Sequence, residues 1–327
     1  MIPTNSPYLV PFDGSFRITD YPTAPTTAGN DRKWKKRLKK SVAKLAKLQR
    51  LLYADDRFSL LLIFQAMDAA GKDSTIRAVM SGVNPAGFQT YSFKQPSSEE
   101  LDHDFLWRSA CRLPERGRIG IFNRSYYEEV LVVRTHPEYL SVQKLPTTDN
   151  LDALWEQRYQ SIREHELHLH RSGTIVLKFW LNVSRCEQLN RFIARIDEPS
   201  KNWKFSSGDV KESRLWDKYM AGYQAALNAT SRAHAPWYAI PADNKTFMRM
   251  TVADTVVKTL AALPLRFPVL DENERNELQG LRAELVAEQA TLRDQKTAPK
   301  ARHDDQTKVT SKPSKPQKSK KKRKSGN

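Results

Sequence analysis

Apolar and polar segments alternate along residues 57–265 in a way that predicts strands separated by helices. Continuous apolar runs predict strands buried on both faces at Ser59–Gln65, Arg118–Phe122 and Thr174–Leu181, and shorter runs predict two more at Phe88–Phe93 and Trp237–Ile240. Helical spacing covers the segments between and after them: Lys72–Ser81, Ser97–Leu113, Asn150–Arg171, Ser184–Ala194, Val210–Arg232 and Lys245–Ala262. This order predicts an α/β domain in three α/β/α layers around a parallel five-stranded sheet.

The segments before this domain differ from it and from each other. Residues 1–30 are rich in Pro and Thr and lack a period, so they predict an extended arm. Residues 31–56 place Trp34, Leu38, Val42 and further leucines at helical spacing, with Lys and Arg between them. This pattern predicts a basic amphipathic helix docked on the body; a helix lying on a membrane surface is the alternative.

The chain ends in a polar helix and a basic tail. Residues 266–295 contain the helical pattern Asn273–Leu292, whereas residues 296–327 are rich in Lys, Ser and Pro and predict disorder. The formal net charge is +17, and 12 basic against 2 acidic residues put +10 of it in Lys296–Asn327. A body of +7 is typical of a protein that binds polyanions, and the tail either solubilises the chain or binds nucleic acid and other polyanions non-specifically.

Hydropathy and cysteine usage point to a cytoplasmic protein. No apolar run approaches the roughly 18–20 residues of a membrane helix, and no signal peptide is recognisable at the N-terminus. Cys111 and Cys186 lie far apart, which predicts free thiols in a reducing compartment.

The segment after the first strand has the form of a phosphate-binding loop. Strand Ser59–Gln65 leads into a Gly-Lys turn and a helix, so backbone N–H groups of residues 69–74 are predicted to hold phosphate and Lys72 to add a positive charge. The expected binding residues are Ala69, Ala70, Gly71, Lys72, Asp73 and Ser74. The loop departs from the usual G-x-x-x-x-G-K-[ST] pattern, because Ala66 replaces the first glycine and Asp73 the hydroxyl residue.

Asp68 is the informative residue of this loop. A carboxylate there would repel phosphate unless a cation lies between them, so Asp68 and Asp73 are the candidate ligands for Mg²⁺, with Mn²⁺ as an alternative. Proton transfer from an attacking group is a second use for Asp68, and helix capping or an Asx turn is the purely structural interpretation.

Two further groups of residues are predicted to join the loop. Strand Arg118–Phe122 is followed by Asn123, Arg124 and Glu128, and carboxyl ends of parallel strands meet at one sheet edge. Arg124 can clamp phosphate with two hydrogen bonds. Residues 184–215 resemble a lid that can close over a transferring phosphoryl group; a solvated basic face is the alternative. Its cations are Arg191, Arg195, Lys201 and Lys204.

These motifs together resemble the polyphosphate kinase 2 family. The resemblance is carried by Gln65–Asp73 (QAMDAAGKD), Ser81–Pro85 (SGVNP), Ser92–Pro96 (SFKQP), Ile121–Glu128 (IFNRSYYE) and Arg195–Lys204 (RIDEPSKNWK), and it extends from about Asp31 to Leu263. It implies a fold like that of thymidylate kinase with a helical lid, and reversible phosphoryl transfer between inorganic polyphosphate and AMP, ADP or ATP with Mg²⁺. It also implies a homodimer or homotetramer.

The resemblance assigns roles residue by residue. Asp68 corresponds to an aspartate that coordinates magnesium or activates the acceptor phosphate, Lys72 to the phosphate lysine, Arg124 to a phosphate ligand, and Arg191 or Arg195 to a lid arginine. Many members have Asp where this chain has Asn123, so a metal-ligand role there does not carry over directly. The pattern is most similar to the subgroup that phosphorylates both AMP and ADP, and Glu128 is a candidate for choosing the nucleotide.

Two other functions are compatible with parts of the sequence. An ATP-dependent nucleoside monophosphate kinase would share the fold, but Asp68 and the basic surplus argue against it. A non-catalytic polyanion-binding protein would explain the tail but not the loop.

Overall fold

The computed structural model describes residues 5–27, 29–204 and 206–297. The chain divides into two compact units, Met1–Pro268 and Val269–Asn327. The first unit contains the sheet and all the candidate site residues; the described part of the second is one helix, α11 (Glu272–Thr297). Leu278, Leu281 and Leu285 of α11 are exposed.

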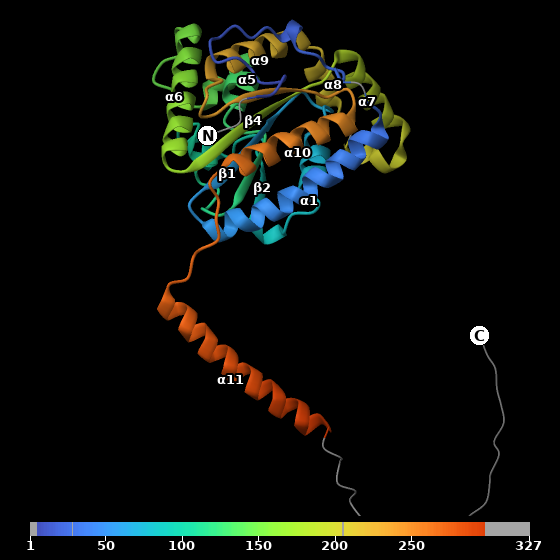
Figure 1. Ribbon diagram of the computed structural model, residues 1–327. Helices are drawn as coiled ribbons and strands as arrows, with labels where there is room; N and C mark the ends of the chain where they lie inside the picture. Colours follow the sequence, from blue (N-terminus) through green and yellow to red (C-terminus); the bar gives the residue numbers. More distant parts are fainter. Residues whose placement is uncertain (1–4, 28, 205, 298–327) are drawn as a thin grey trace, which may run out of the picture. The chain divides into compact units, whose positions relative to one another are not determined.

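The first unit is built on one parallel sheet of five strands in the order β2-β3-β1-β4-β5 (Figure 1). Their bounds are β1 Ser59–Gln65, β2 Phe88–Ser92, β3 Ile119–Asn123, β4 Thr174–Asn182 and β5 Trp237–Pro241. Every residue of β1, β4 and β5 is buried, as expected for strands covered on both faces. The predicted α/β class and five-stranded parallel sheet are therefore confirmed.

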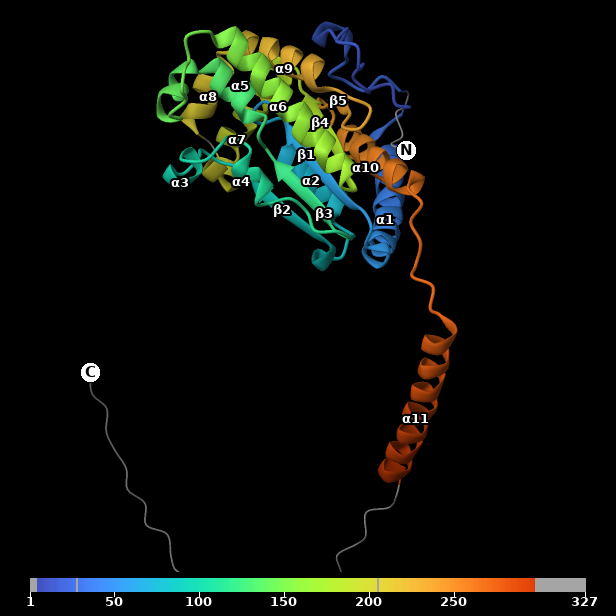
Figure 2. The same ribbon diagram turned by 90° about the vertical axis from the view of Figure 1, so that its left-hand side faces the viewer.

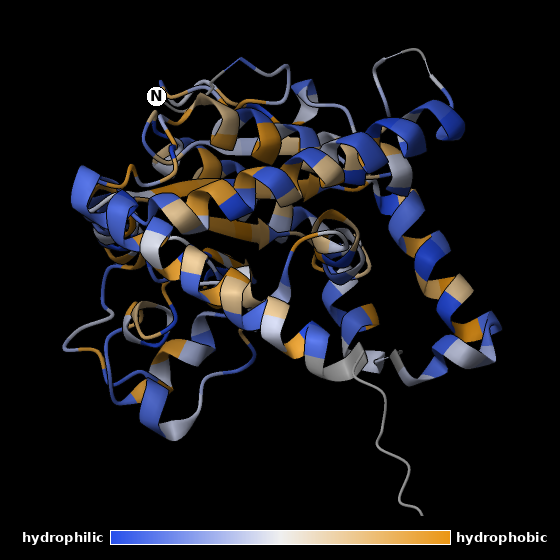
Figure 3. Ribbon diagram, turned by 60° about the horizontal axis from the view of Figure 1, so that its bottom comes forward, coloured by the Kyte–Doolittle hydropathy of each residue, from blue (hydrophilic) through white to orange (hydrophobic). Residues whose placement is uncertain are grey.

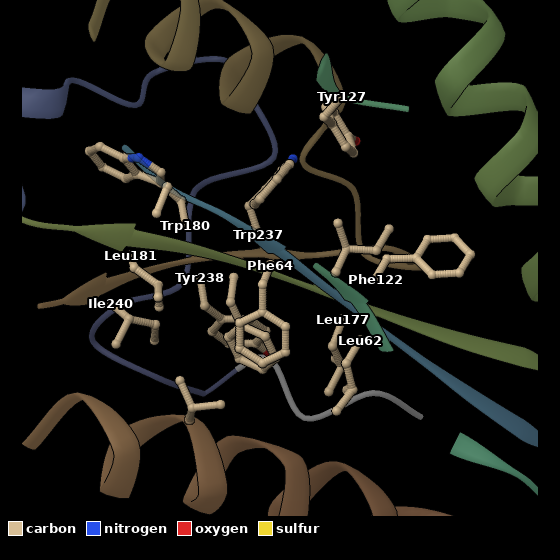
Figure 4. Packing of buried hydrophobic residues seen from close by; sticks show 14 of the residues in the cluster. Leu62, Phe64, Phe122, Tyr127, Leu177, Trp180, Leu181, Trp237, Tyr238 and Ile240 are labelled. Carbon is tan, nitrogen blue, oxygen red and sulfur yellow. The ribbon is translucent and has the colours of Figure 1, made fainter. Parts of the chain in front are cut away.

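Helices cover both faces of the sheet (Figures 1 and 2). One face carries α1 (Asp31–Asp55), α2 (Lys72–Met80) and α10 (Lys245–Ala262); the other carries α5 (Glu128–Thr135), α6 (Leu151–Arg171) and α9 (Trp216–Thr230). Figure 3 shows apolar strands enclosed by helices whose outward faces are hydrophilic. The alternation of side chains along the strands builds two cores: Phe64 and Tyr238 point to one face, whereas Trp180 and Trp237 point to the other (Figure 4).

Two predicted helices are each broken into two. The segment Ser97–Leu113 contains only α3 (Ser98–Leu101), which begins with the predicted capping box, and α4 (Trp107–Ala110). The carboxylate of Asp104 accepts a hydrogen bond from the backbone N–H of Leu106 (2.9 Å), a local turn that competes with a continuous helix. The segment Val210–Arg232 contains α8 (Ser207–Ser213) and α9, separated at Arg214 and Leu215.

Several short elements escaped the sequence prediction. These are α5 and the 3-10 helices Ile18–Asp20, Pro85–Gly87, Pro137–Val142 and Pro199–Lys204. The lid segment consists of α7 (Arg185–Asp197), the last of these 3-10 helices and α8. No helix of the described residues is both long and apolar enough to cross a membrane.

The segment before α1 protects the open edge of the sheet. Tyr8 and Val10 hydrogen-bond to β5, from Ala239 N–H to the Tyr8 carbonyl (2.8 Å) and from Val10 N–H to the Trp237 carbonyl (3.0 Å). An uncovered edge strand is prone to pair with other chains, so this segment protects β5 from pairing with another molecule.

Candidate phosphoryl-transfer site

The loop between β1 and α2 adopts a conformation suited to an anion. Gly71 precedes the first helical residue with φ 106°, and Ala69 also has a positive φ of 61°. A side chain at position 71 would be strained, and its Cβ would lie 3.3 Å from Met248 Cε. The hydroxyls of Ser74 and Thr75 both donate to the Gly71 carbonyl (3.0 and 2.9 Å), which fixes the loop against the first turn of α2.

Lys72 is buried beneath this loop. Its Nζ donates to the carbonyl oxygens of Ala66 (2.7 Å) and Met67 (3.4 Å), and its side chain is folded back toward the end of β1. Burial lowers the pKa of Lys72, and the nearby Asp68 carboxylate opposes that shift. An ammonium held in a desolvated position interacts strongly with any phosphate that enters the loop.

Asp68 and Arg124 link the two strand ends that the sequence predicted to meet. Arg124 Nη2 lies 2.8 Å from Asp68 Oδ1, and its Nη1 lies 3.4 Å from Glu128 Oε2. Arg124 has a φ of 63°, so the turn after β3 is strained at the residue that reaches the loop. The two carboxylates, Glu128 first, raise the pKa of Arg124, whereas burial raises the pKa of Glu128.

Asp73 and Asn123 form a second link between the same elements. Asn123 Nδ2 donates to Asp73 Oδ1 (2.6 Å) and to Ser92 Oγ (3.3 Å), while Asn123 Oδ1 is buried without a hydrogen-bond partner among the described residues. The carboxylates of Asp68 and Asp73 and the unpartnered amide oxygen of Asn123 are hard oxygen donors. Such donors fit a divalent cation that takes its other ligands from phosphate and water.

The lid arginines have different surroundings. Arg191 is buried, and its guanidinium donates to the carbonyls of Ala69 (3.2 Å) and Ala70 (2.6 Å) in the loop and Ala242 (2.6 Å) after β5. Its Nε donates to Glu187 (2.7 Å), so all three guanidinium nitrogens are engaged and the side chain holds the loop in place in this conformation. Arg195 forms an ion pair with Asp209 (3.3 Å) instead.

Lys201 of the lid does not join the loop in this conformation. Lys201 is exposed and pairs with Glu198. The side chain of Lys204 lies outside the described residues. The structure thus brings Asp68, Lys72, Asp73, Asn123, Arg124 and Glu128 together. It leaves Lys201 outside this group.

A cavity of about 300 Å³ opens beside Asp68 and Arg124. It is large enough for a nucleoside, and carboxylates and aromatic rings line it. Its lining includes Glu128, His136, Asp209, Glu212, Tyr219 and Tyr223. Gln188 of α7 also borders it and donates to the Asp68 carbonyl (2.9 Å).

The sequence alone did not assign Asp209, Glu212 or Gln188 to the site. They lie on lid helices about 120–140 residues away from the loop, and no local motif marks them. Burial raises the pKa of Asp209, and the charge of Asp68 adds to this shift. Asp209 and Asp68 both line this cavity.

Comparison with known proteins identifies close relatives. The family model described as Polyphosphate kinase 2 matches residues 28–266. The chain is 52% identical over 250 residues to the ADP-polyphosphate phosphotransferase of Rhodopseudomonas palustris, covering 76% of this chain and 86% of the relative. It is 42% identical over 263 residues to the AMP/ADP-polyphosphate phosphotransferase of Meiothermus ruber, covering 80% of this chain and 94% of the relative. The crystal structure of polyphosphate kinase 2 from Arthrobacter aurescens superposes with a TM-score of 0.76 at 37% identity, covering 83% of this chain and 93% of that one.

Proposed function

Because the chain belongs to the polyphosphate kinase 2 family, we propose that it transfers a phosphoryl group reversibly between inorganic polyphosphate and the nucleotides AMP and ADP. In the forward direction, an oxygen of the nucleotide's last phosphate bonds to the terminal phosphorus of polyphosphate. The bridging P–O bond breaks, and a polyphosphate shorter by one phosphate leaves. With ADP as acceptor the product is ATP.

The observation that carries this proposal is the convergence of Lys72, Asp68 and Arg124 at the carboxyl ends of β1 and β3. Phosphoryl transfer requires in-line positioning and charge neutralisation more than a protein nucleophile. Lys72 and the loop N–H groups neutralise the transferred group. Arg124 supplies a second cation, and the Asp68 carboxylate orients it.

Asp68 and Asp73, with the free oxygen of Asn123, are the residues we assign to a divalent cation, Mg²⁺ first and Mn²⁺ as the alternative. Such a cation neutralises and orients phosphate oxygens. The cavity next to Asp68 accommodates the nucleoside, with Tyr219 and Tyr223 as apolar walls.

Arg195 is the lid residue that we assign to the transition state. It lies on α7, its ion pair with Asp209 uses only the Nη1 end of the guanidinium, and Asp209 lines the same cavity as Asp68. A small movement of α7 and α8 would exchange Asp209 for a phosphate oxygen. Lys201 and Lys204 follow on the same lid and are assigned to the polyphosphate chain. We propose an assembly of two or four chains in a cytoplasmic enzyme.

The test is a reaction of the purified protein with Mg²⁺, long-chain polyphosphate and AMP, without ATP, followed by chromatography of the nucleotides. Formation of ADP and then ATP is the expected result. Conversion of ADP alone would retain the polyphosphate donor and exclude AMP as acceptor. Product formation only after ATP is added would indicate an ordinary nucleotide kinase instead.

A further inference from the structure

Helix α1 presents a long face of exposed cations. Ten basic residues lie between Arg32 and Arg50, and Asp31 is the single acidic residue of Asp31–Arg50. Nine of the ten have exposed side chains and no ion pair among the described residues: Arg32, Lys33, Lys35, Lys36, Lys39, Lys40, Lys44, Lys47 and Arg50. The tenth, Arg37, pairs with Asp254 of α10 (2.5 Å). We call these nine residues the α1 basic face; they extend over about 27 Å at 1.5 Å per residue.

The apolar side of the same helix is already covered. Leu45 and Leu52 are fully buried, Trp34 packs on Phe247 of α10 with ring centroids 5.2 Å apart, and Ser41 hydrogen-bonds to Asp254. A helix that lies in a membrane surface must insert its apolar side between lipids. Here that side is occupied by α10, so only the cations are free to meet a partner.

Crowded cations require an explanation. Lys36, Lys40 and Lys44 follow one another at i, i+4 spacing, where like charges repel and destabilise a helix. Carboxylates at these positions would have stabilised it. A polyanion laid along the helix removes the repulsion, because each cation then faces a negative charge.

Cations continue from α1 toward the phosphate loop. Asn244, the N-cap of α10, donates to Asp31 at the start of α1 (3.1 Å), and Lys245 and Arg249 follow it on α10. Neither of these two, nor Arg77 of α2, has an ion pair among the described residues. Burial lowers the pKa of Arg249, and the positive charges of Arg77 and Arg191 lower it further. Arg191 in turn holds the loop carbonyls.

The side chains of the α1 basic face favour a phosphate chain over single-stranded nucleic acid. Single-stranded nucleic acid is usually held by aromatic side chains that stack on bases. The one aromatic residue of Arg32–Arg50 is Trp34, which is engaged with Phe247. A shallow hollow beside Lys47 and Arg50, closed on its other side by the turn Ser81–Asn84, offers charge and width without a stacking surface. A bare phosphate chain fits this surface.

We propose that the α1 basic face binds the distal part of a long polyphosphate chain while the chain's end reacts at the phosphate loop. The inference rests on the proposed function and adds a remote binding site to it. Each phosphate contact raises affinity through counterion release and adds to the salt dependence of binding. The site therefore favours long chains over short ones and does not change the chemical step.

The test compares two variants with equal loss of charge. Lys36→Gln/Lys40→Gln/Lys44→Gln/Lys47→Gln removes four cations of the α1 basic face. Arg17→Gln/Arg171→Gln/Arg275→Gln/Arg282→Gln removes four exposed cations elsewhere, none of them in an ion pair among the described residues. We expect the first variant to raise KM for long-chain polyphosphate at least about tenfold and leave kcat and the KM for tripolyphosphate within about twofold. The control variant should have the wild-type kcat and the wild-type KM for both long-chain polyphosphate and tripolyphosphate.

Direct binding separates this inference from the proposed function. Fluorescence anisotropy with labelled long-chain polyphosphate, without nucleotide, should show a salt dependence whose slope is smaller by up to about 3 in the α1 variant. Equal slopes and equal KM values in both variants and the wild type would overturn the inference. A loss confined to binding of phosphatidylserine vesicles would overturn it in favour of a membrane. A wild type without turnover on any polyphosphate would defeat the proposed function instead, whatever the anisotropy shows.

Discussion

Asn123 at the end of β3 donates a hydrogen bond to Asp73 in the first turn of α2, with Nδ2 and Oδ1 2.6 Å apart. A neutral amide therefore occupies a position from which a carboxylate would repel Asp73. The pair holds one candidate metal ligand in a fixed orientation and leaves the amide oxygen of Asn123 buried, with no hydrogen-bond partner among the described residues.

Replacing this amide by a carboxylate should make stability depend on the metal. In Asn123→Asp, two carboxylates at hydrogen-bond distance repel each other, and we expect a loss of about 1–2 kcal/mol in the free energy of unfolding without divalent cations. Adding Mg²⁺ should recover most of the loss, whereas the wild type should respond less. Thermal unfolding with and without Mg²⁺ measures both effects, and Asn123→Ala is the control that lacks the extra charge. An equal response to Mg²⁺ in all three proteins would argue against a cation at Asp73.

Lys72 should matter for turnover much more than for stability. Lys72→Ala removes the buried ammonium from the loop, and we expect kcat/KM to fall by at least about 100-fold, as for the loss of one transition-state donor. The exposed Lys258 provides the control, and Lys258→Ala should keep near-normal activity. If Lys72→Ala retained wild-type turnover while folded, the loop would not be the site of transfer.

The two lid arginines should separate by phenotype. Arg191→Lys keeps the charge but cannot span the carbonyls of Ala69, Ala70 and Ala242, so we expect about 2–3 kcal/mol less stability together with lower turnover. Arg195→Lys also keeps the charge and changes only one partly exposed ion pair, so the free energy of unfolding should change by no more than about 0.5 kcal/mol. Denaturant unfolding and steady-state kinetics on both variants make the comparison. Comparable stability losses in both variants would show that Arg191 does not hold the loop in place any more than Arg195 does.

The sheet and the position of the loop were predictable because their signals are local. Strand β1 is a continuous apolar run, and Gly71-Lys72 follow it directly. The meeting of Asp68 with Arg124 followed from the rule that parallel strands end at one edge. The lid could not be read in the same way. The position of Arg191 in the lid predicts a phosphate ligand. In the structure its guanidinium donates to the carbonyls of Ala69 and Ala242, each more than 50 residues away along the chain.

The histidines of α6 illustrate the same limit. His165-Glu166-Leu167-His168 has the residue types of a metal site, yet the carboxylate of Glu166 is fully buried against Lys178 of β4 (2.6 Å) and accepts hydrogen bonds from Tyr126 and Tyr127. No spacing in the sequence reveals that Lys178, in a strand, points toward this helix. The network anchors the two tyrosines that follow Arg124 and Ser125.

Removing either charge of the Glu166–Lys178 pair should therefore destabilise the fold, and the losses in the two single variants should not add in the double variant. Glu166→Gln leaves the Lys178 ammonium without its counter-charge, and Lys178→Met leaves a carboxylate without one. We expect each to lose about 3–5 kcal/mol in the free energy of unfolding. The double variant Glu166→Gln/Lys178→Met should lose at least about 2 kcal/mol less than the sum. Urea unfolding of the four proteins gives the coupling energy, and additive losses would contradict the assignment of one network.

His136 should make stability depend on pH near neutrality. Burial alone would lower the pKa of His136, but hydrogen bonds with the carboxylates of Glu212 (3.0 Å) and Glu138 (3.1 Å) outweigh it and raise the pKa above 6.5. A group whose pKa is higher in the folded state binds more protons there, so its stabilisation is complete below the unfolded pKa and is lost as pH rises through the folded pKa. Glu212 also accepts a hydrogen bond from Tyr219 (2.7 Å), so loss of the positive charge on His136 loosens a wall of the cavity.

We expect the free energy of unfolding contributed by His136 to decrease from pH 5.5 to pH 8, and KM for the nucleotide to rise over the same range. His136→Gln should flatten both differences relative to the wild type, whereas His103→Gln, on an exposed ring, should not. Parallel pH profiles for the wild type and His136→Gln would show that this ion pair does not link protonation to the cavity.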